Sequence, residues 1–295
     1  MTVAVAGLGS MGMGAALNLA ARGFAVVGAE PREAAWAEIE AAGGRAVAHA
    51  GLLPEGLDGL VLFTVNAEQA SAVLDAALES VAPGGVVINC VTVAPEVAQR
   101  IGARVEAADR RYLDCPVSGG AKGARAGTMT AMASGSPAAF ERAGPVLAAI
   151  AGKVWRLGDE PGVGSTVKMV NQLLAGVHIA TAAEAMALGI RAGADPQALF
   201  DVITTSAGNS WMFENRVPHI LAGDDTPLSS VNIFVKDLGI VLDQARTLTF
   251  PLPMASAAHQ LFLAAAAAGE GGRDDAFVIR VWERLAGIAL PEGKP

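Results

Sequence analysis

The chain has 295 residues, 52% of them hydrophobic and 17% charged, which excludes a disordered protein and suffices for about two globular domains. Its 21 Lys and Arg residues stand against 29 Asp and Glu, and the formal net charge of −8 argues against nucleic acid as a partner. The two cysteines, Cys90 and Cys115, are too few for a disulfide framework and indicate a reducing, cytoplasmic setting.

The uncharged run over residues 1–21 superficially resembles a secretory signal. No Lys or Arg precedes its apolar segment, and Gly7, Gly9, Gly12 and Gly14 dilute its hydrophobicity. We therefore expect neither a signal peptide nor a membrane span, and we predict a soluble protein.

In the first half of the chain, short β-branched runs alternate with helical patterns, an order typical of parallel βαβ units. Strands are expected at residues 2–6, 24–29, 59–65, 86–89, 111–114, 129–134 and 153–156. Helices are expected at residues 11–22, 32–41, 68–81 and 94–107. This order predicts an α/β domain over residues 1–160, with a doubly wound parallel sheet of the Rossmann type.

A turn-rich stretch over residues 158–164 ends that alternation, and little strand signal follows it. Helices are expected at residues 167–192, 196–204, 210–221, 231–246, 254–267 and 275–285. We predict an all-α domain over residues 161–295.

A G-x-G-x-x-G motif follows the first expected strand and opens the first helix, and Glu30 closes the second strand 23 residues after Gly7. This context indicates a dinucleotide site rather than an ordinary strand-to-helix turn. Glycines there permit a tight turn, close approach of the backbone to a pyrophosphate, and close helix packing. The motif residues predicted to bind the dinucleotide are Gly7, Gly9, Ser10, Met11 and Gly12.

Glu30 favours NAD as the cofactor, because a carboxylate at this position accepts hydrogen bonds from a ribose diol and repels a 2′-phosphate. Arg32 keeps a second interpretation open. Its guanidinium either pairs with such a phosphate, which would indicate NADP, or faces solvent at the start of a helix.

Beyond these features, four strings in order resemble the motifs of the β-hydroxyacid dehydrogenases, which include the 3-hydroxyisobutyrate dehydrogenases. The strings are Gly7-Leu-Gly-Ser-Met-Gly12, Asp114-Cys-Pro-Val-Ser-Gly-Gly120, Gly162-Val-Gly-Ser-Thr-Val-Lys168-Met-Val-Asn171 and Lys236-Asp-Leu238. Within the family, residues 209–216 and 226–239 are most similar to the NAD-dependent L-threonate dehydrogenases.

The resemblance implies a Rossmann domain joined by a long helix to an all-α domain, with substrate in the cleft between them and homodimers or homotetramers built on the helical halves. It places the catalytic lysine at Lys168 and its partner asparagine at Asn171. Contacts to the cofactor fall on Val65, Asn66, Thr92 and Lys236. Many members have Leu-Pro where this chain has Val65-Asn66, so only a backbone contact is expected to persist there.

The chemistry of a hydroxy acid suits Lys168. Oxidation needs a base that takes the hydroxyl proton while hydride leaves the carbon, and reduction needs the same group as an acid. A free lysine has a pKa of about 10.4, so burial or a nearby cation must lower it. Asn171, at i+3, shares a helix face with Lys168 and can hold the amine or the substrate hydroxyl.

Ser118, Gly119 and Gly120 follow an expected strand at the carboxyl edge of the sheet, where doubly wound folds bind ligands. Their hydroxyl and backbone N–H groups are predicted to cradle the substrate carboxylate, although an ordinary glycine turn has the same sequence. Two interpretations of Lys236-Asp237 stay open. The pair is either a charge pair on an exposed helix face or contains the cofactor contact that the resemblance implies. The four histidines are scattered without ligand spacing, so no metal is assigned.

Three functional hypotheses follow. The first is an oxidoreductase that transfers a hydride between a small hydroxy acid and NAD, with L-threonate, giving 2-dehydro-L-erythronate, as the leading substrate. The second is an NADPH-dependent semialdehyde or imine reductase on the same scaffold. The third is a nucleotide-binding module without catalysis, against which the joint presence of Lys168, Asn171 and Ser118 argues.

Overall fold

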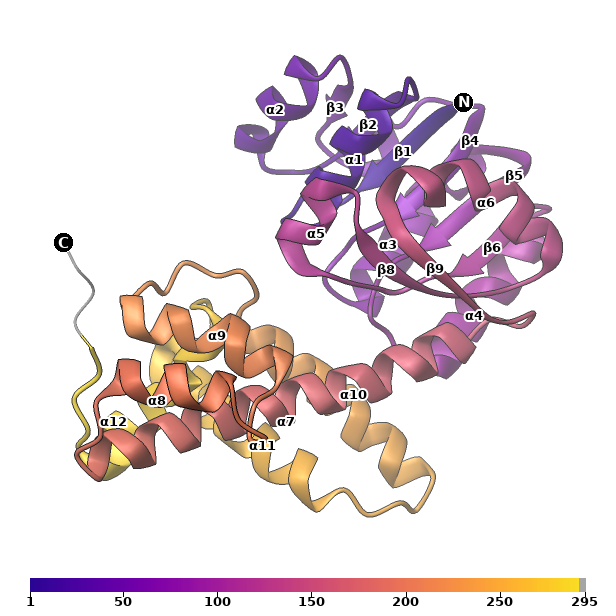
Figure 1. The fold of residues 1–295 in the computed structure, drawn as a ribbon. Coiled ribbons are helices and arrows are strands. Elements are labelled where there is room, and N and C mark those ends of the chain that lie inside the picture. Colours follow the sequence, from indigo (N-terminus) through magenta and orange to yellow (C-terminus); the bar gives the residue numbers. More distant parts are fainter. Residues whose placement is uncertain (292–295) are drawn as a thin grey trace. The chain divides into compact units, whose positions relative to one another are not determined.

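The strands of the first half form one nine-stranded sheet in the order β3-β2-β1-β4-β5-β6-β8-β7, with β9 paired to β8. In the computed structural model, which describes residues 1–291, this sheet belongs to a unit comprising Met1–Lys168 (Figure 1). The strands are β1 (Thr2–Ala6), β2 (Ala25–Ala29), β3 (Arg45–Val47), β4 (Leu57–Leu62), β5 (Val81–Asn89), β6 (Arg111–Asp114), β7 (Val117–Ser118), β8 (Met129–Ser134) and β9 (Ala151–Gly158).

Helices cover both faces of this sheet. They are α1 (Gly12–Ala21), α2 (Trp36–Ala41), α3 (Ala67–Ala77), α4 (Pro95–Ala107), α5 (Gly120–Ala126) and α6 (Pro137–Ile150). Single 3₁₀ turns occur at Glu33–Ala35, Ala50–Leu52 and Leu78–Ser80. Alternate residues of β1 point to opposite faces, so Val3 and Val5 pack with α1 and α6 while Ala4 and Ala6 pack with α3 and α4. The doubly wound α/β prediction is therefore confirmed.

Two features of the sheet go beyond the sequence pattern. Strands β1 to β6 are parallel, but β8 runs antiparallel to β6 and to β7, and β9 is parallel to β8. Asp114, the last residue of β6, pairs with Ser134, the last of β8, whereas Ser118 pairs with Thr130. Strand β7 thus continues beyond the carboxyl end of β6, alongside β8.

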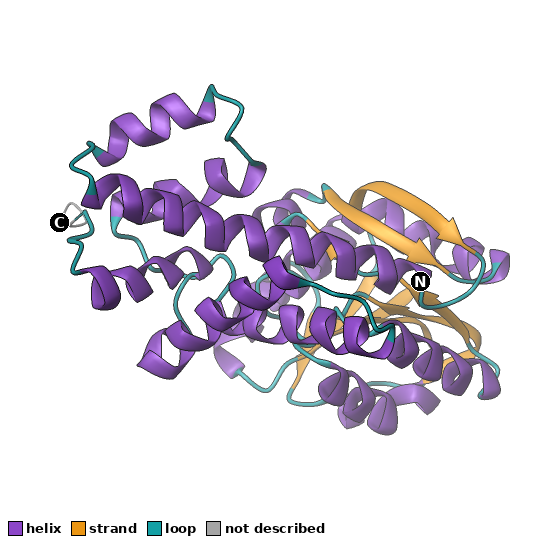
Figure 2. Ribbon diagram, turned by 90° about the horizontal axis from the view of Figure 1, so that it is seen from below, coloured by secondary structure: helices purple, strands orange, loops and turns teal. Residues whose placement is uncertain are grey.

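The second unit, Met169–Pro295, is built from helices (Figure 2). Its elements are α7 (Val163–Arg191), which begins in the first unit, α8 (Pro196–Thr204), α9 (Trp211–Ala222), α10 (Val231–Thr247), α11 (Pro253–Ala265), a π-helical turn (Ala266–Glu270), a 3₁₀ turn (Asp275–Ile279) and α12 (Arg280–Ala286). Over residues 169–291 the only β-type pairing is an isolated bridge between Ser230 and Asp274. The all-α prediction is confirmed, and the expected boundary between residues 160 and 161 stays a prediction.

Helix α7 contributes several buried side chains to this second core. Its length and composition would by themselves allow it to cross a membrane. However, Ile179, Ala183 and Met186 are at most 1% exposed and pack with apolar side chains of α9, α10 and α11. The apolar character of α7 is thus explained by packing within the helical unit.

Candidate active site

The predicted cofactor residues of the first unit follow the carboxyl ends of four neighbouring parallel strands. The glycine motif follows β1, Glu30 follows β2, Val65 and Asn66 follow β4, and Thr92 follows β5. Since β2, β1, β4 and β5 are adjacent and parallel, these segments lie along one edge of the sheet. The structure thus brings together the predicted residues of the first unit at the edge where such folds bind nucleotides.

The glycine motif has the steric properties that a dinucleotide site needs. Gly7 has φ +93°, and a Cβ there would lie 2.7 Å from the carbonyl oxygen of Phe63. A Cβ on Gly12 would lie 1.9 Å from the carbonyl oxygen of Gly7, so only glycine allows α1 to start this close to the turn. A Cβ on Gly9 would meet nothing within 4 Å, which leaves open space over the backbone where a pyrophosphate would approach.

Glu30 is buried, with 5% exposure, and is held by three donors. Its Oε2 accepts a hydrogen bond from the Leu8 backbone N–H at 3.0 Å. Its Oε1 accepts from the Arg32 backbone N–H at 3.1 Å and from Arg32 Nε at 2.7 Å. Burial acts to raise the pKa of Glu30, but the side chain and backbone of Arg32 outweigh it, so the pKa lies below its ordinary value of 4.5.

The Arg32 side chain remains 65% exposed while it pairs with Glu30. The guanidinium faces solvent, as one of the two interpretations expects, but it is also bound to the Glu30 carboxylate, a partner that neither interpretation included. The Glu30 carboxylate is fixed at the end of β2, where the ribose of a dinucleotide is recognised in this fold. The residues present thus fit NAD.

Asn66 caps helix α3. Its Oδ1 accepts from the Gln69 backbone N–H at 2.9 Å, and Gln69 Oε1 accepts from the Val65 backbone N–H at 3.0 Å. The departure from the family's Leu-Pro therefore has a structural explanation, since an N-cap asparagine replaces a proline as the helix-start signal. The Val65 and Asn66 contacts to the cofactor stay a prediction, as does that of Thr92, which is partly exposed.

Ser118, Gly119 and Gly120 lie beyond the carboxyl end of β6, at the end of β7 and the start of α5. Gly119 and Gly120 have φ angles of +129° and +60°, which L side chains rarely adopt. Both glycines are exposed, and Ser118 is partly exposed. Their location agrees with the predicted edge, and their role as a carboxylate cradle stays a prediction.

Asp114 anchors the first turn of α7, the helix that carries Lys168. This carboxylate is fully buried. Its Oδ2 accepts from the backbone N–H groups of Gly162 at 2.9 Å and Ser165 at 2.8 Å, and its Oδ1 accepts from Ser165 Oγ at 2.7 Å. Burial raises the pKa of Asp114, although these hydrogen bonds oppose the shift. Lys168 lies one turn beyond Ser165 and is 7% exposed.

Replacing Asp114 by alanine is expected to lower the free energy of unfolding by about 2–4 kcal/mol, because several buried donors lose their acceptor at a helix N-terminus. Urea unfolding followed by circular dichroism measures the change. Asp195→Ala is the matched control, since Asp195 caps α8 through one exposed hydrogen bond of 2.8 Å to the Ala198 N–H. Equal destabilisation by the two variants would contradict the anchoring role.

In the second unit, four side chains form a polar row between α7 and α10. Asn171 Nδ2 donates to Gln172 Oε1 at 3.0 Å, and Gln172 Nε2 donates to Asp237 Oδ2 at 2.5 Å. Lys236 Nζ donates to Asp237 Oδ1 at 2.5 Å. Asp237 is 2% exposed, so the hypothesis of an exposed charge pair is wrong. Two of the predicted site residues, Asn171 and Lys236, are thereby connected through residues that were not assigned.

Comparison with known proteins agrees with this geometry. Residues 2–158 match the family described as the NAD binding domain of 6-phosphogluconate dehydrogenase, and residues 162–282 match the one described as NAD-binding of NADP-dependent 3-hydroxyisobutyrate dehydrogenase. The L-threonate dehydrogenase of Cupriavidus necator is 53% identical over 292 residues, which cover 98% of this chain and 97% of that protein. The chain belongs to the 3-hydroxyisobutyrate dehydrogenase family. The family prediction is confirmed.

Further relatives of this dehydrogenase support the same assignment. The L-threonate dehydrogenase of Escherichia coli is 50% identical over 99% of this chain and 97% of that protein. The crystal structure of 3-hydroxyisobutyrate dehydrogenase from Salmonella typhimurium superposes with a TM-score of 0.90 at 49% identity, covering 95% of this chain and 99% of that one. The protein is thus an NAD-dependent hydroxyacid dehydrogenase, as predicted, and transfers a hydride between a hydroxy acid and NAD.

Three residues that the structure places in these hydrogen-bond networks have no predicted role, namely Asp114, Gln172 and Asp237, although the motif strings include Asp114 and Asp237. Helix periodicity could have found Asp237, because it occupies the same face of α10 as the buried Phe234, Leu238 and Val241. Asp114 closes a buried strand immediately before a glycine-rich segment. Gln172 carried no signal, since its partner is 65 residues away in sequence.

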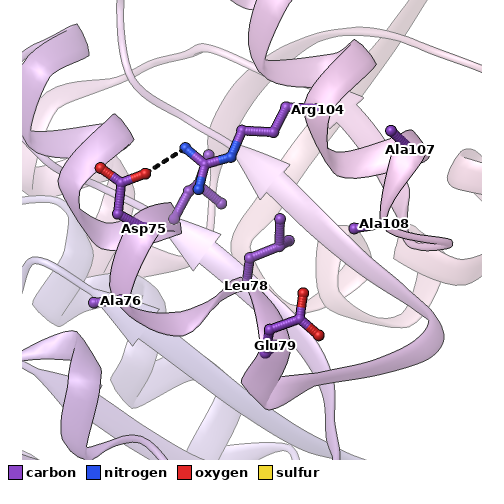
Figure 3. A pocket seen from close by; sticks show the side chains of 8 residues that line it. Asp75, Ala76, Leu78, Glu79, Arg104, Ala107 and Ala108 are labelled. Carbon is purple, nitrogen blue, oxygen red and sulfur yellow. Dashed lines mark ion pairs between the residues drawn. The ribbon is translucent and has the colours of Figure 1, made fainter.

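A surface pocket of about 390 Å³ in the first unit includes none of the predicted site residues in its lining. Figure 3 shows that it is lined by the last turns of α3 and α4, where Arg104 pairs with Asp75 at 2.6 Å. Helices of βαβ units end at the amino edge of a parallel sheet, opposite the cofactor edge. The pocket therefore belongs to a different part of the first unit from the predicted site.

The two cysteines are free, buried thiols. A hydrogen bond with Cys115 is the largest effect that raises the pKa of Cys90 well above its ordinary value, and burial is the second. A thiol held protonated in this way is a poor nucleophile. Among residues 1–291, no three His, Cys, Asp or Glu side chains are grouped so as to hold a metal ion.

Proposed function

We propose that this dehydrogenase oxidises L-threonate to 2-dehydro-L-erythronate. Relatives named L-threonate dehydrogenase are 53% and 50% identical across nearly the whole chain. Relatives named for 2-(hydroxymethyl)glutarate and L-serine are only 34% and 30% identical. The imine reductase of Streptomyces aurantiacus is 22% identical with a TM-score of 0.65, a likeness that concerns the fold alone.

Lys168 is assigned as the group that exchanges a proton with the substrate hydroxyl. In the oxidation the O–H proton passes to the Lys168 amine, the C–H bond breaks with its electron pair leaving as hydride, and the C–O bond becomes a carbonyl. NAD, when bound, supplies the hydride acceptor. In the reduction the protonated amine returns the proton to the oxygen.

The remaining predicted residues are assigned to binding and orientation. Asn171 accepts a hydrogen bond from the substrate hydroxyl or from the amine, and Ser118, Gly119 and Gly120 donate to the substrate carboxylate. NAD is held by the glycine motif and Glu30, with contacts from the segments after β4 and β5 and from Lys236. The cofactor set is Gly7, Gly9, Ser10, Met11, Gly12, Glu30, Val65, Asn66, Thr92 and Lys236.

The burial of Lys168 carries this assignment. Lysine side chains are rarely buried, and Lys168 is only 7% exposed, between the apolar residues Val167 and Met169 of α7. An amine that must act as a base needs such surroundings, because burial favours its neutral form.

We further propose that the two domains have the separate roles that the family resemblance implies. Residues 1–160 serve NAD binding, and residues 161–295 serve substrate binding and dimerisation. The enzyme acts in the cytoplasm as a homodimer or homotetramer. Support for association comes from apolar side chains on α7, where Val170, Leu174 and Leu188 are 52%, 50% and 70% exposed.

A panel of four-carbon sugar acids and small hydroxy acids, assayed with NAD and with NADP, tests the proposal. L-threonate with NAD is expected to give the highest kcat/KM, measured as NADH formation, and D-threonate and L-serine serve as matched controls. Faster turnover of another hydroxy acid would replace the substrate. Reduction of semialdehydes or imines with NADPH, or NAD binding without any oxidation, would overturn the proposed function.

A further inference from the structure

A buried carboxylate, Asp237, stands at the centre of the polar row between α7 and α10. It is 2% exposed and accepts from Lys236 on one oxygen and from Gln172 on the other, each at 2.5 Å. Gln172 is 8% exposed and is the only residue that links Asp237 to Asn171 in the described row. Neither Asp237 nor Gln172 has a role in the function proposed above.

The helices approach closely enough for this link because of a glycine. A Cβ on Gly176, one turn after Gln172, would lie 3.0 Å from Leu238 and from Phe234 of α10. Leu238 is the immediate neighbour of Asp237. The small residue thus lets the Gln172 amide reach across to the Asp237 carboxylate.

The donors and acceptors in the polar row fix the orientation of the Gln172 and Asn171 amides. A carboxylate has only acceptors, so Gln172 must turn its NH₂ group to Asp237 and its Oε1 to Asn171. Oε1 in turn requires a donor, so Asn171 must present its NH₂ group to Gln172. The Oδ1 of Asn171 is then the end available to accept a hydrogen bond from a hydroxyl or an ammonium group.

We propose that Asp237 and Gln172 are positioning residues. Together they fix the orientation of the Asn171 amide, and Asp237 also holds the Lys236 ammonium group. The inference rests on the proposed function, because that function assigns binding roles to Asn171 and Lys236. A purely structural contact at this place would be served by apolar side chains, like those of the neighbouring Phe234, Leu238 and Val241. The buried carboxylate instead aligns two functional groups on two helices.

A double-mutant cycle tests the link to Asn171. Gln172→Met keeps the volume and removes the relay, and kcat is expected to fall about 10- to 100-fold while the KM for NAD changes less than about twofold. In an Asn171→Ala background the same change is expected to have almost no further effect, because Gln172 acts through Asn171. Additive losses in the two backgrounds would overturn the inference in favour of a structural role.

The matched control is Gln197→Met. Gln197 also donates to an aspartate, Asp201 at 2.9 Å, but on the exposed surface of α8. This variant is expected to keep wild-type kinetics. A full loss in Asn171→Ala with none in Gln172→Met would refute the positioning role alone, whereas wild-type kcat in Asn171→Ala would refute the assignment of Asn171 as well.

A second measurement does not depend on turnover. Asp237→Asn removes the charge that holds Lys236, so NADH binding, followed by fluorescence, is expected to weaken about 5- to 20-fold. Asp243→Asn, at an exposed position of the same helix, is the control and is expected to leave the Kd unchanged. Unchanged NADH affinity in Asp237→Asn would refute the Lys236 part of the inference even if no hydroxy acid were oxidised.

Discussion

Lys168→Ala is expected to lower kcat by about 10²–10⁴-fold, the usual contribution of a positioned proton-transfer group. Without the amine, the hydroxyl proton has no positioned acceptor when the hydride leaves, and water is a poor substitute for a positioned base. The affinity for NAD is expected to stay within about twofold, because the glycine motif and Glu30 are untouched. Steady-state NADH formation and an NADH-binding titration measure the two quantities.

The control for this variant is Lys153→Ala, which removes an exposed lysine from strand β9 of the same unit. It is expected to behave as wild type. Added methylamine is expected to restore part of the activity of Lys168→Ala by supplying the missing base. An unchanged kcat in Lys168→Ala would remove the assigned proton acceptor, and a parallel loss of NADH binding would show that the lysine serves the cofactor instead.

The fold could largely be predicted because its signals are local. Buried strands such as Thr2–Ala6 and cap residues such as Asp195 are encoded by a few consecutive residues. The direction of β8 could not be predicted, because it depends on its pairing with β6 and not on its own composition. The three-residue strand β3 lacks a long apolar run and gave no signal.

The same difference between local and long-range signals applies to the candidate site. The glycine motif could be interpreted because its steric requirements are local, as at Gly12. Periodicity within α10 could have indicated that Asp237 is buried, but no spacing within either helix reveals its hydrogen bond with Gln172 of α7. Arg32 illustrates an intermediate case, since the sequence showed a cation near Glu30 but the hydrogen-bond geometry decides its partner.

The pairing of Glu30 with Arg32 leads to the prediction of largest effect on cofactor choice. Glu30→Gln keeps the side-chain volume but removes the charge that opposes a 2′-phosphate and binds the guanidinium. The preference for NAD over NADP, expressed as the ratio of kcat/KM values, is expected to fall by about 10- to 100-fold, since hydrogen bonds to charged groups contribute about 1.5–3 kcal/mol. Kinetics with both cofactors at one hydroxy-acid concentration measure the ratio.

A second substitution, at Arg32, distinguishes the two possible causes of this change in cofactor preference. In Glu30→Gln the guanidinium is released and can pair with the 2′-phosphate, so adding Arg32→Ala is expected to abolish most of the gain with NADP while leaving the loss with NAD. Glu38→Gln is the control, because Glu38 also pairs with an arginine, Arg125 at 2.5 Å, but lies on α2 beyond the end of β2. If the double variant kept the full gain with NADP, relief of repulsion by Glu30 would account for cofactor choice without Arg32. If Glu30→Gln left the ratio unchanged, the carboxylate at the end of β2 would not be the group that selects NAD.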